Sequence, residues 1–368
     1  MNSEERVMKS LNFQTPDRIP IGRQSFWSEF VEKWRQRKKL SKEVNINDWY
    51  ESDISVIVAD ETFFPSQKRI SKKENGYVFE NDGWGRIIKW KEGANRFQFP
   101  ARDVENILED KSKLDKIKFE PASLDIRYKY FSSKVKEEKK KRCVFCKVGG
   151  PFHRSWFIRG NNLLMDLAGD VGFAKRLAEK VGEHRIGIGL ESLKRGNLYD
   201  AGIWIFDDMG ANTGPLFSPK TFEKVYFPVY KKMISSFKKA GAKKVILHSD
   251  GNILPFLDML IEAGINGINP VEYKAGMNIL KLKKKYDKKL SYIGGVDNAI
   301  ILPRGDKKEI KNHVCPILEA GREGGIIIGT HSIGPDITIE TYDYYHNLIR
   351  RYGNYEIKTD GEFIREGE

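Results

Sequence analysis

Histidine and aspartate residues recur in this chain at the ends of short β-branched runs, which are typical of β-strands. Of its six histidines, three follow such runs: His153, His248 and His331. His248 and Asp250 are two residues apart, a spacing that puts both side chains on one side of an extended segment. With His331 as a third ligand, they predict a site for a divalent metal ion, of which zinc acting as a Lewis acid is the first choice.

The same segment has an alternative interpretation without a metal. His248 and Asp250 could hydrogen-bond to each other, while Asp250 or Asn252 caps the helix that follows. We favour the metal site, because a histidine and an aspartate together at this position exceed what helix capping requires.

Polar residues also follow the other predicted strands, and we divide them by the chemistry of their side chains. The catalytic candidates are Asp60, Asp208 and His331. The substrate-binding candidates are Arg23, Gln24, Phe152, His153, Asn269, Glu272 and Asp297. Asp207 is not among them, because adjacent strand residues point in opposite directions and we expect Asp208 to face the site.

Two cysteines, Cys143 and Cys146, are three residues apart in a strand pattern, which turns their side chains to opposite faces. Without a second pair of cysteines, this spacing predicts ordinary core residues rather than a metal site.

The elements that must position these residues are short strands alternating with amphipathic helices. Each predicted strand is followed by a segment long enough for a right-handed crossover to a parallel neighbour. Eight such units predict a (β/α)8 TIM barrel, with its chemistry at the C-terminal ends of the strands. A doubly wound open sheet is the alternative, but no G-x-G-x-x-G motif follows the first strand. The predicted strands are 18–22, 54–58, 143–148, 202–206, 245–248, 267–269, 290–294 and 325–329, and the main predicted helices are 161–195, 218–240, 253–263, 277–286 and 307–320.

The length that exceeds a simple barrel lies mainly in residues 62–141, after the second predicted strand. Within this insertion, residues 77–90 predict a β-hairpin that turns at Asn81, Asp82 and Gly83. The hairpin either covers the barrel mouth or is an insertion without a role in the site. We therefore expect a single barrel domain over residues 1–358 and a polar tail over residues 359–368.

The composition narrows the function classes. The chain has 368 residues, of which 40% are hydrophobic, but it contains no apolar stretch of the length that a membrane span needs. The polar start of the chain and only three cysteines favour a cytoplasmic protein without disulfides. Its 64 basic residues outnumber 51 acidic ones, giving a net charge of +13. We interpret this excess as a basic surface compatible with small acidic substrates, and expect neither nucleic acid nor membrane as a partner.

A series of short motifs extends through nearly the whole chain. They are Glu5-Arg-Val-Met-Lys-Ser-Leu-Asn12, Pro16-Asp-Arg-Ile-Pro20, Gly150-Pro-Phe152 with Arg159-Gly160, Phe206-Asp-Asp-Met-Gly210, Gly214-Pro-Leu-Phe-Ser-Pro219, His248-Ser-Asp-Gly-Asn252, Gly294-Gly-Val-Asp297 and Thr330-His-Ser-Ile333. In content and order they resemble the motifs of the uroporphyrinogen decarboxylase (URO-D) superfamily. The resemblance implies a distorted (β/α)8 barrel and, as in related decarboxylases, a homodimer.

One branch of this superfamily decarboxylates uroporphyrinogen, a tetrapyrrole of porphyrin biosynthesis, without a cofactor. In that branch the resemblance assigns Arg23 and Gln24 to the place of an arginine pair that binds substrate carboxylates, Asp60 to the pyrrole N–H groups, and His331 to the histidine after the last strand. Trp27 stands where the second arginine is expected, and Phe157 replaces a tyrosine. Several carboxylates need several guanidinium groups, so these departures disfavour the decarboxylase branch.

The other branch comprises cobalamin-dependent methyltransferases, in which a His-x-Cys motif and a later cysteine bind zinc. His248 matches that histidine, Asp250 replaces the first cysteine, and His331 falls close to the second. We therefore expect a metal-assisted, corrinoid-linked methyltransferase that acts on a small molecule, with a corrinoid protein as partner. The harder ligands imply an oxygen- or nitrogen-bound methyl compound. A uroporphyrinogen decarboxylase is the second hypothesis, and a non-catalytic corrinoid- or tetrapyrrole-binding protein is the third.

Overall fold

Seven parallel strands form one curled sheet in the computed structural model, which describes residues 1–22, 25–93 and 101–355. Each strand pairs in parallel with the next one, in the order β14-β13-β12-β11-β8-β7-β2. Helical crossovers connect them, so the fold is the predicted TIM-barrel-like α/β class. The strands are β2 Ile54–Val58, β7 Cys143–Gly149, β8 Gly202–Phe206, β11 Lys244–His248, β12 Gly267–Asn269, β13 Ser291–Gly295 and β14 Ile326–Gly329.

The first predicted strand lies between β14 and β2 but forms only isolated bridges, from Ile21 to Ile328 and from Arg18 to Asn354. Pro20 has no N–H to donate, and the N–H of Ile21 donates to the carboxylate of Asp53 instead of to a strand. The N–H of Gly22 still donates to the carbonyl of Ile328, and the N–H of Asp53 donates to the carbonyl of Ile21. These bonds link the two edge strands through the N-terminal segment.

Side chains on the two faces of the sheet form two separate apolar clusters. The inner cluster contains Cys143, Trp204 and Ile246, and it also contains Val7 and Leu11 of helix α1 (Ser3–Leu11). Helix α1 therefore fills the N-terminal end of the barrel. The C-terminal ends of the strands lie at the opposite end. Cys146 belongs to the larger outer cluster, so the two cysteines lie on opposite faces, as their spacing predicts.

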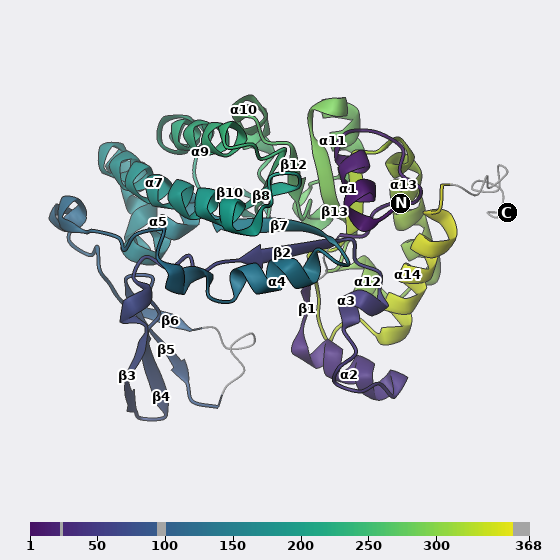
Figure 1. The fold of residues 1–368 in the computed structure, drawn as a ribbon, viewed down its shortest axis with the longest axis horizontal. Coiled ribbons are helices and arrows are strands. Elements are labelled where there is room, and N and C mark those ends of the chain that lie inside the picture. Colours follow the sequence, from purple (N-terminus) through teal and green to yellow (C-terminus); the bar gives the residue numbers. More distant parts are fainter. Residues whose placement is uncertain (23–24, 94–100, 356–368) are drawn as a thin grey trace.

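Helices pack around the sheet, as Figure 1 shows for α7, α9 and α10. The predicted helix 161–195 is divided in two, because Asp170 ends α6 and its side chain caps α7 by accepting the N–H of Phe173. The remaining helices are α2 Ser28–Lys38, α3 Ile46–Trp49, α4 Phe131–Glu138, α5 Pro151–Arg159, α6 Asn162–Gly169, α7 Val171–Gly196, α8 Pro219–Thr221, α9 Phe227–Lys239, α10 Leu257–Ala263, α11 Ile279–Tyr286, α12 Ile301–Arg304, α13 Lys307–Ala320 and α14 Ile339–Tyr352. Short strands β1 Ser25–Phe26 and β15 Ser332–Ile333 pair with each other, as do β9 Gly210–Ala211 and β10 Gly214–Pro215.

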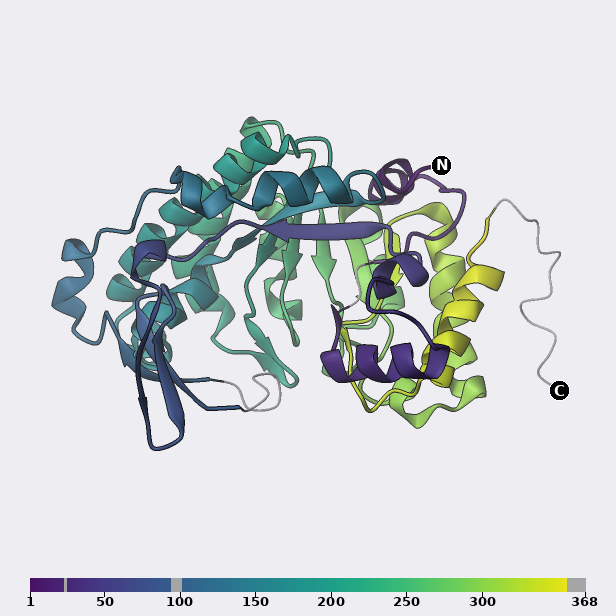
Figure 2. The ribbon, with the colours of Figure 1, turned by 60° about the horizontal axis from the view of Figure 1, so that its bottom comes forward.

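The insertion after β2 contains a four-stranded antiparallel sheet rather than an isolated hairpin. Its strands are β3 Arg69–Glu74, β4 Tyr77–Asn81, β5 Arg86–Lys91 and β6 Arg102–Asn106. In Figures 1 and 2 this sheet projects from the body of the protein. The turn between β4 and β5 packs against α5, where the ring centroids of Trp84 and Phe157 are 5.1 Å apart. Its role as a cover of the barrel mouth stays a prediction.

Among the described residues, no helix combines the length and apolar character that crossing a membrane requires.

Candidate functional site

The carboxyl ends of β8, β11 and β12 bring polar and aromatic side chains together at the open end of the barrel. His248 of β11 is paired in register with Phe206 of β8 on one side and with Asn269 of β12 on the other. Trp204 and Ile246 point into the barrel, so strand alternation turns Phe206 and His248 inward as well. The Phe206 ring stacks on the imidazole of His248, with centroids 4.3 Å apart.

Three predicted ligands converge at this end of the barrel. One ligand atom each from His248, Asp250 and His331 lies within 4.8 Å of the other two. Oδ1 of Asp250 is 3.3 Å from Nε2 of His248 and 3.3 Å from Nε2 of His331. Oδ1 of Asn252 accepts the N–H of Leu254 at 3.0 Å in the turn that follows, whereas α10 (Leu257–Ala263) begins without a side-chain cap.

Asn269 determines the tautomer of His248. Nδ2 of Asn269 donates to the carbonyl of Ile293 at 3.0 Å, which leaves its Oδ1 to accept a hydrogen bond. That oxygen lies 2.6 Å from Nδ1 of His248, so Nδ1 carries the proton. In the neutral ring, Nε2 therefore presents a lone pair toward Asp250.

This arrangement leaves a buried oxygen without a donor. Within the described part of the chain, Oδ1 of Asp250 is buried and no hydrogen bond to it is formed. Its lone pairs face the Nε2 atoms of His248 and His331, so a cation among them, either a proton or a metal ion, stabilises the cluster. Burial favours the neutral imidazole of His248, but the carboxylates of Asp250 and Asp208 outweigh it and raise its pKa.

Asp208 links this cluster to a third histidine. Its Oδ1 accepts the N–H of Asp250 at 3.2 Å and lies 3.6 Å from Nε2 of His248. Its Oδ2 lies 3.3 Å from Nδ1 of His153, whose side chain is one-third exposed. Burial opposes ionisation of Asp208, but His153 and His248 hold its pKa well below the usual range. Asp208 is therefore an anion that faces two imidazoles.

Its neighbour Asp207 points the other way and is structural. It is fully buried and accepts the N–H groups of Phe152 and His153 at 3.1 and 2.6 Å, and the hydroxyl of Tyr230 at 2.7 Å. Burial raises the pKa of Asp207 to about 6. By binding the first N–H groups of α5, Asp207 fixes the helix that carries His153.

Glu272 completes the group of predicted residues around the cluster. Its Oε2 accepts the N–H of Gly251 at 2.7 Å, and its Oε1 lies 3.8 Å from Nδ1 of His331. Glu272 thus stabilises the loop that carries Asp250 and places a negative charge beside His331.

Two predicted site residues, Phe152 and Asp297, lie in other surroundings. Phe152 is wholly buried against the rings of Trp156 and Tyr226, so it is a core residue and offers no surface to a substrate. Asp297 is buried and its Oδ1 accepts three N–H groups at the start of α12, including that of Ile300 at 2.6 Å, which makes it a helix cap. Their position after a strand was therefore not sufficient to place them in the site.

Asp60 is held by its own neighbours. Its Oδ1 accepts the hydroxyl of Thr62 at 2.6 Å, and its Oδ2 forms an ion pair with Nζ of Lys68 at 2.6 Å. Burial opposes ionisation, but Lys68 and Thr62 lower the pKa of Asp60. The predicted substrate-binding residues Arg23 and Gln24 lie outside the described residues.

A group of charged residues that the sequence predictions omitted lies beside the cluster. The carboxylate of Glu61 is 2.7 Å from Arg154, 3.3 Å from Lys147 and 3.8 Å from Arg185. Burial would raise the pKa of Glu61, but these cations hold it well below the usual range. The sequence pattern could have identified Lys147. It lies two and four residues after Phe145 and Cys143 in β7, so it faces the barrel interior as they do.

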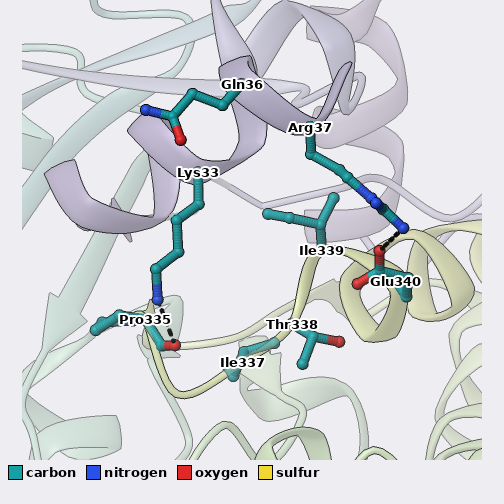
Figure 3. A pocket seen from close by; sticks show the side chains of 8 residues that line it. All are labelled: Lys33, Gln36, Arg37, Pro335, Ile337, Thr338, Ile339 and Glu340. Atoms are coloured by element: carbon teal, nitrogen blue, oxygen red, sulfur yellow. Dashed lines mark hydrogen bonds and ion pairs between the residues drawn. The ribbon is translucent and has the colours of Figure 1, made fainter. Parts of the chain in front are cut away.

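A separate groove of about 610 Å³ lies between α2 and the segment that leads into α14. Figure 3 shows that its charged side chains pair across it: Nζ of Lys33 approaches the carbonyl of Pro335 at 3.5 Å, and Arg37 pairs with Glu340 at 2.8 Å. It is lined by Lys33, Gln36, Arg37, Pro335, Ile337, Thr338, Ile339 and Glu340. These contacts make it a region where two elements pack, apart from the histidine cluster.

Comparisons with known proteins agree with the barrel architecture. The family profile described as uroporphyrinogen decarboxylase (URO-D) matches residues 86–352. The solved structure of a methyltransferase from Methanosarcina mazei is similar, with a TM-score of 0.67 and 15% sequence identity over 96% of this chain and 99% of that chain. At this level of identity the similarity shows the fold alone. A search of curated proteins finds no match.

Proposed function

This chain belongs to the uroporphyrinogen decarboxylase family, and from that premise we propose that it is an enzyme of the methyltransferase branch. Its reaction would be corrinoid-linked methyl transfer assisted by a divalent metal ion at His248, Asp250 and His331. The observation that carries the proposal is the buried Oδ1 of Asp250, placed 3.3 Å from two imidazole nitrogens. The methyltransferase activity of the structural neighbour supports the same branch.

The donor set fits a divalent ion of the zinc type. Two imidazoles and one carboxylate leave coordination positions open, which is typical of a catalytic rather than a structural site. Such an ion, when bound, polarises an oxygen or nitrogen atom of the substrate as a Lewis acid. The hydrogen bond from His248 to Asn269 directs Nε2 toward Asp250 and the place that the ion would take.

His153 and Asp208 would supply acid–base chemistry beside the metal. Oδ2 of Asp208 lies 3.3 Å from Nδ1 of His153 and would accept a hydrogen bond from it, which leaves Nε2 of His153 as the atom that can take or give a proton. Transfer of a methyl group from an ether leaves an alkoxide or phenoxide, which needs a proton. His153 is one-third exposed and can exchange that proton with solvent.

Elemental analysis of protein purified without chelator tests the metal site. We expect about one divalent ion per chain, and we expect His248→Ala and Asp250→Ala to lose it. Asp200→Asn is the matched control, because Asp200 is exposed and precedes β8 at the far end of the barrel. Absence of stoichiometric metal, together with an unchanged His248→Ala variant, would overturn the site. Methyl transfer is then followed by the visible absorbance of cob(I)alamin on addition of methyl ethers and methylamines.

The decarboxylase alternative depends on Asp60, which would have to receive pyrrole N–H groups. Both of its oxygens are engaged by Thr62 and Lys68, which disfavours that role. Formation of coproporphyrinogen from uroporphyrinogen, abolished by Asp60→Asn, would favour this alternative. A cobalamin absorbance change without turnover of any methyl donor would favour the non-catalytic binding protein.

A further inference from the structure

The interior of the barrel opens on the side of β2 and β7. Along β2, the exposed fraction of the inward side chains rises from 2% at Ile54 to 46% at Val58. Val58 is paired in register with Lys147 of β7, so the two side chains lie next to each other on the same inner face. An exposed valine on the inner face of a barrel strand marks space that a ligand can occupy.

Lys147 lies on the other side of Phe206 from the histidine cluster. Its Nζ is 4.8 Å from the centroid of the Phe206 ring, and that ring stacks on His248. Strand β8, which carries Phe206, lies between β7 and β11 in the sheet. Adjacent strands are about 4.8 Å apart, so the ammonium group and the metal-binding imidazole are separated by roughly 10 Å.

Among the described residues, three cationic side chains surround the buried carboxylate of Glu61. Glu61 is shared by Lys147, Arg154 and Arg185, so one carboxylate faces three cations. The side chains of Arg154 and Arg185 are 7% and 0% exposed, and in the described part of the chain their buried Nε–H groups have no acceptor. Lys147, at 22%, is the most exposed of the three cations. An added anion would meet this group at Lys147.

We propose that Lys147 binds the carboxylate of a small organic acid whose other end reaches the His248, Asp250 and His331 cluster. The inference deepens the proposed function, on which it rests, by naming the substrate class. Phe206 and Val58 supply the apolar wall between the two ends, so an aromatic or short aliphatic body fits between the carboxylate and the reacting group. The methyl group is carried at the end nearest the cluster.

Two probes of nearly the same shape, one anionic and one neutral, test this inference. Binding of 4-methoxybenzoate and of 4-methoxybenzamide to the purified protein is measured by ligand-observed NMR titration at constant ionic strength. We expect the acid to bind about tenfold more tightly than the amide, because a charge-assisted hydrogen bond is stronger than a neutral one. Equal affinity for the two probes, or absence of binding by the acid, would overturn the inference.

Variants then assign the preference to Lys147. Lys147→Met is expected to weaken binding of the acid about tenfold while binding of the amide changes less than twofold, and Lys147→Arg is expected to keep the preference. Lys243→Met is the matched control, since Lys243 is an exposed lysine that pairs with Asp200 at the far end of the barrel. If Lys147→Met binds the acid as the wild type does, the inference is wrong.

The metal content of the same samples separates this inference from the proposed function. If the protein prefers the acid but holds no metal, the result supports the Lys147 subsite and contradicts the metal-assisted reaction. If the protein holds the metal but binds the two probes equally, the result contradicts the Lys147 subsite and leaves the metal-assisted reaction supported.

Discussion

Oδ1 of Asn269 lies 2.6 Å from Nδ1 of His248, and this contact determines which imidazole nitrogen faces Asp250. The amide of Asn269 is itself fixed by the carbonyl of Ile293. Through these two side-chain contacts, Asn269 controls the direction of a lone pair in the proposed metal site.

Replacement of Asn269 by alanine is expected to lower metal affinity by about 10- to 100-fold, because the imidazole of His248 loses its fixed orientation and tautomer. The measurement is competition with a chromophoric chelator. Asn278→Ala, which removes the N-cap of α11, is the control for a comparable loss of stability away from the site. Equal metal affinities of the Asn269→Ala variant and the wild type would contradict this role.

Replacement of Glu61 by glutamine is expected to destabilise the protein by about 3–5 kcal/mol, because it leaves Lys147, Arg154 and Arg185 without their shared buried carboxylate. Urea denaturation monitored by tryptophan fluorescence measures the change. Glu137→Gln, at an exposed pair with Lys134, should leave the midpoint unchanged. A similar midpoint for both variants would show that the buried cluster does not stabilise the fold.

Gly150→Ala is expected to cost about 1–3 kcal/mol and to displace α5 together with His153. A Cβ atom on Gly150 would lie 2.2 Å from Cγ of Asp207, a distance that forces the buried carboxylate to move. Gly169→Ala is the matched control, because a Cβ there meets nothing within 4 Å. Thermal denaturation compares the two variants, and equal melting temperatures would exclude the predicted clash.

Asp207 is expected to make stability depend on pH. Burial raises the pKa of its carboxyl from 3.8 to about 6, although His153 and Tyr230 favour the ionised form. An acid with a raised pKa in the folded state stabilises the fold while it is protonated, and this contribution is lost as pH rises from about 4 to 6. Over that window the wild type should lose up to about 3 kcal/mol relative to Asp207→Asn. Parallel pH profiles of unfolding free energy would contradict the prediction.

Much of the fold was accessible from the sequence, because parallel strands buried on both faces give short β-branched runs that end in polar residues. Seven of the predicted strands are present, and the family match confirms the resemblance to the uroporphyrinogen decarboxylase superfamily. The first strand is reduced to isolated bridges because the carboxylate of Asp53, distant in sequence, competes for the N–H of Ile21. The local sequence around Ile21 cannot predict this competition, because Asp53 is distant in the chain.

The position of a residue directly after a predicted strand was a less reliable indicator of a site residue than the strand pattern was of the fold. Asp208 and His248 meet because their strands are neighbours, which the barrel topology implies. Phe152 and Asp297 occupy equivalent positions in the chain but serve packing and capping. The difference depends on the direction of the chain after each strand, which no residue type encodes. Lys147 was omitted because it lies within a strand rather than after one.

Helix α1 fills the N-terminal end of the barrel with Val7 and Leu11, and its last carbonyl accepts a hydrogen bond from Lys244. Helix α1 therefore closes one end of the barrel interior, and the C-terminal strand ends that carry the site lie at the other end. In the proposed methyl transfer between two bulky co-substrates, this geometry would impose an order of binding and release. Either the first co-substrate leaves before the second binds, or both occupy the same opening together.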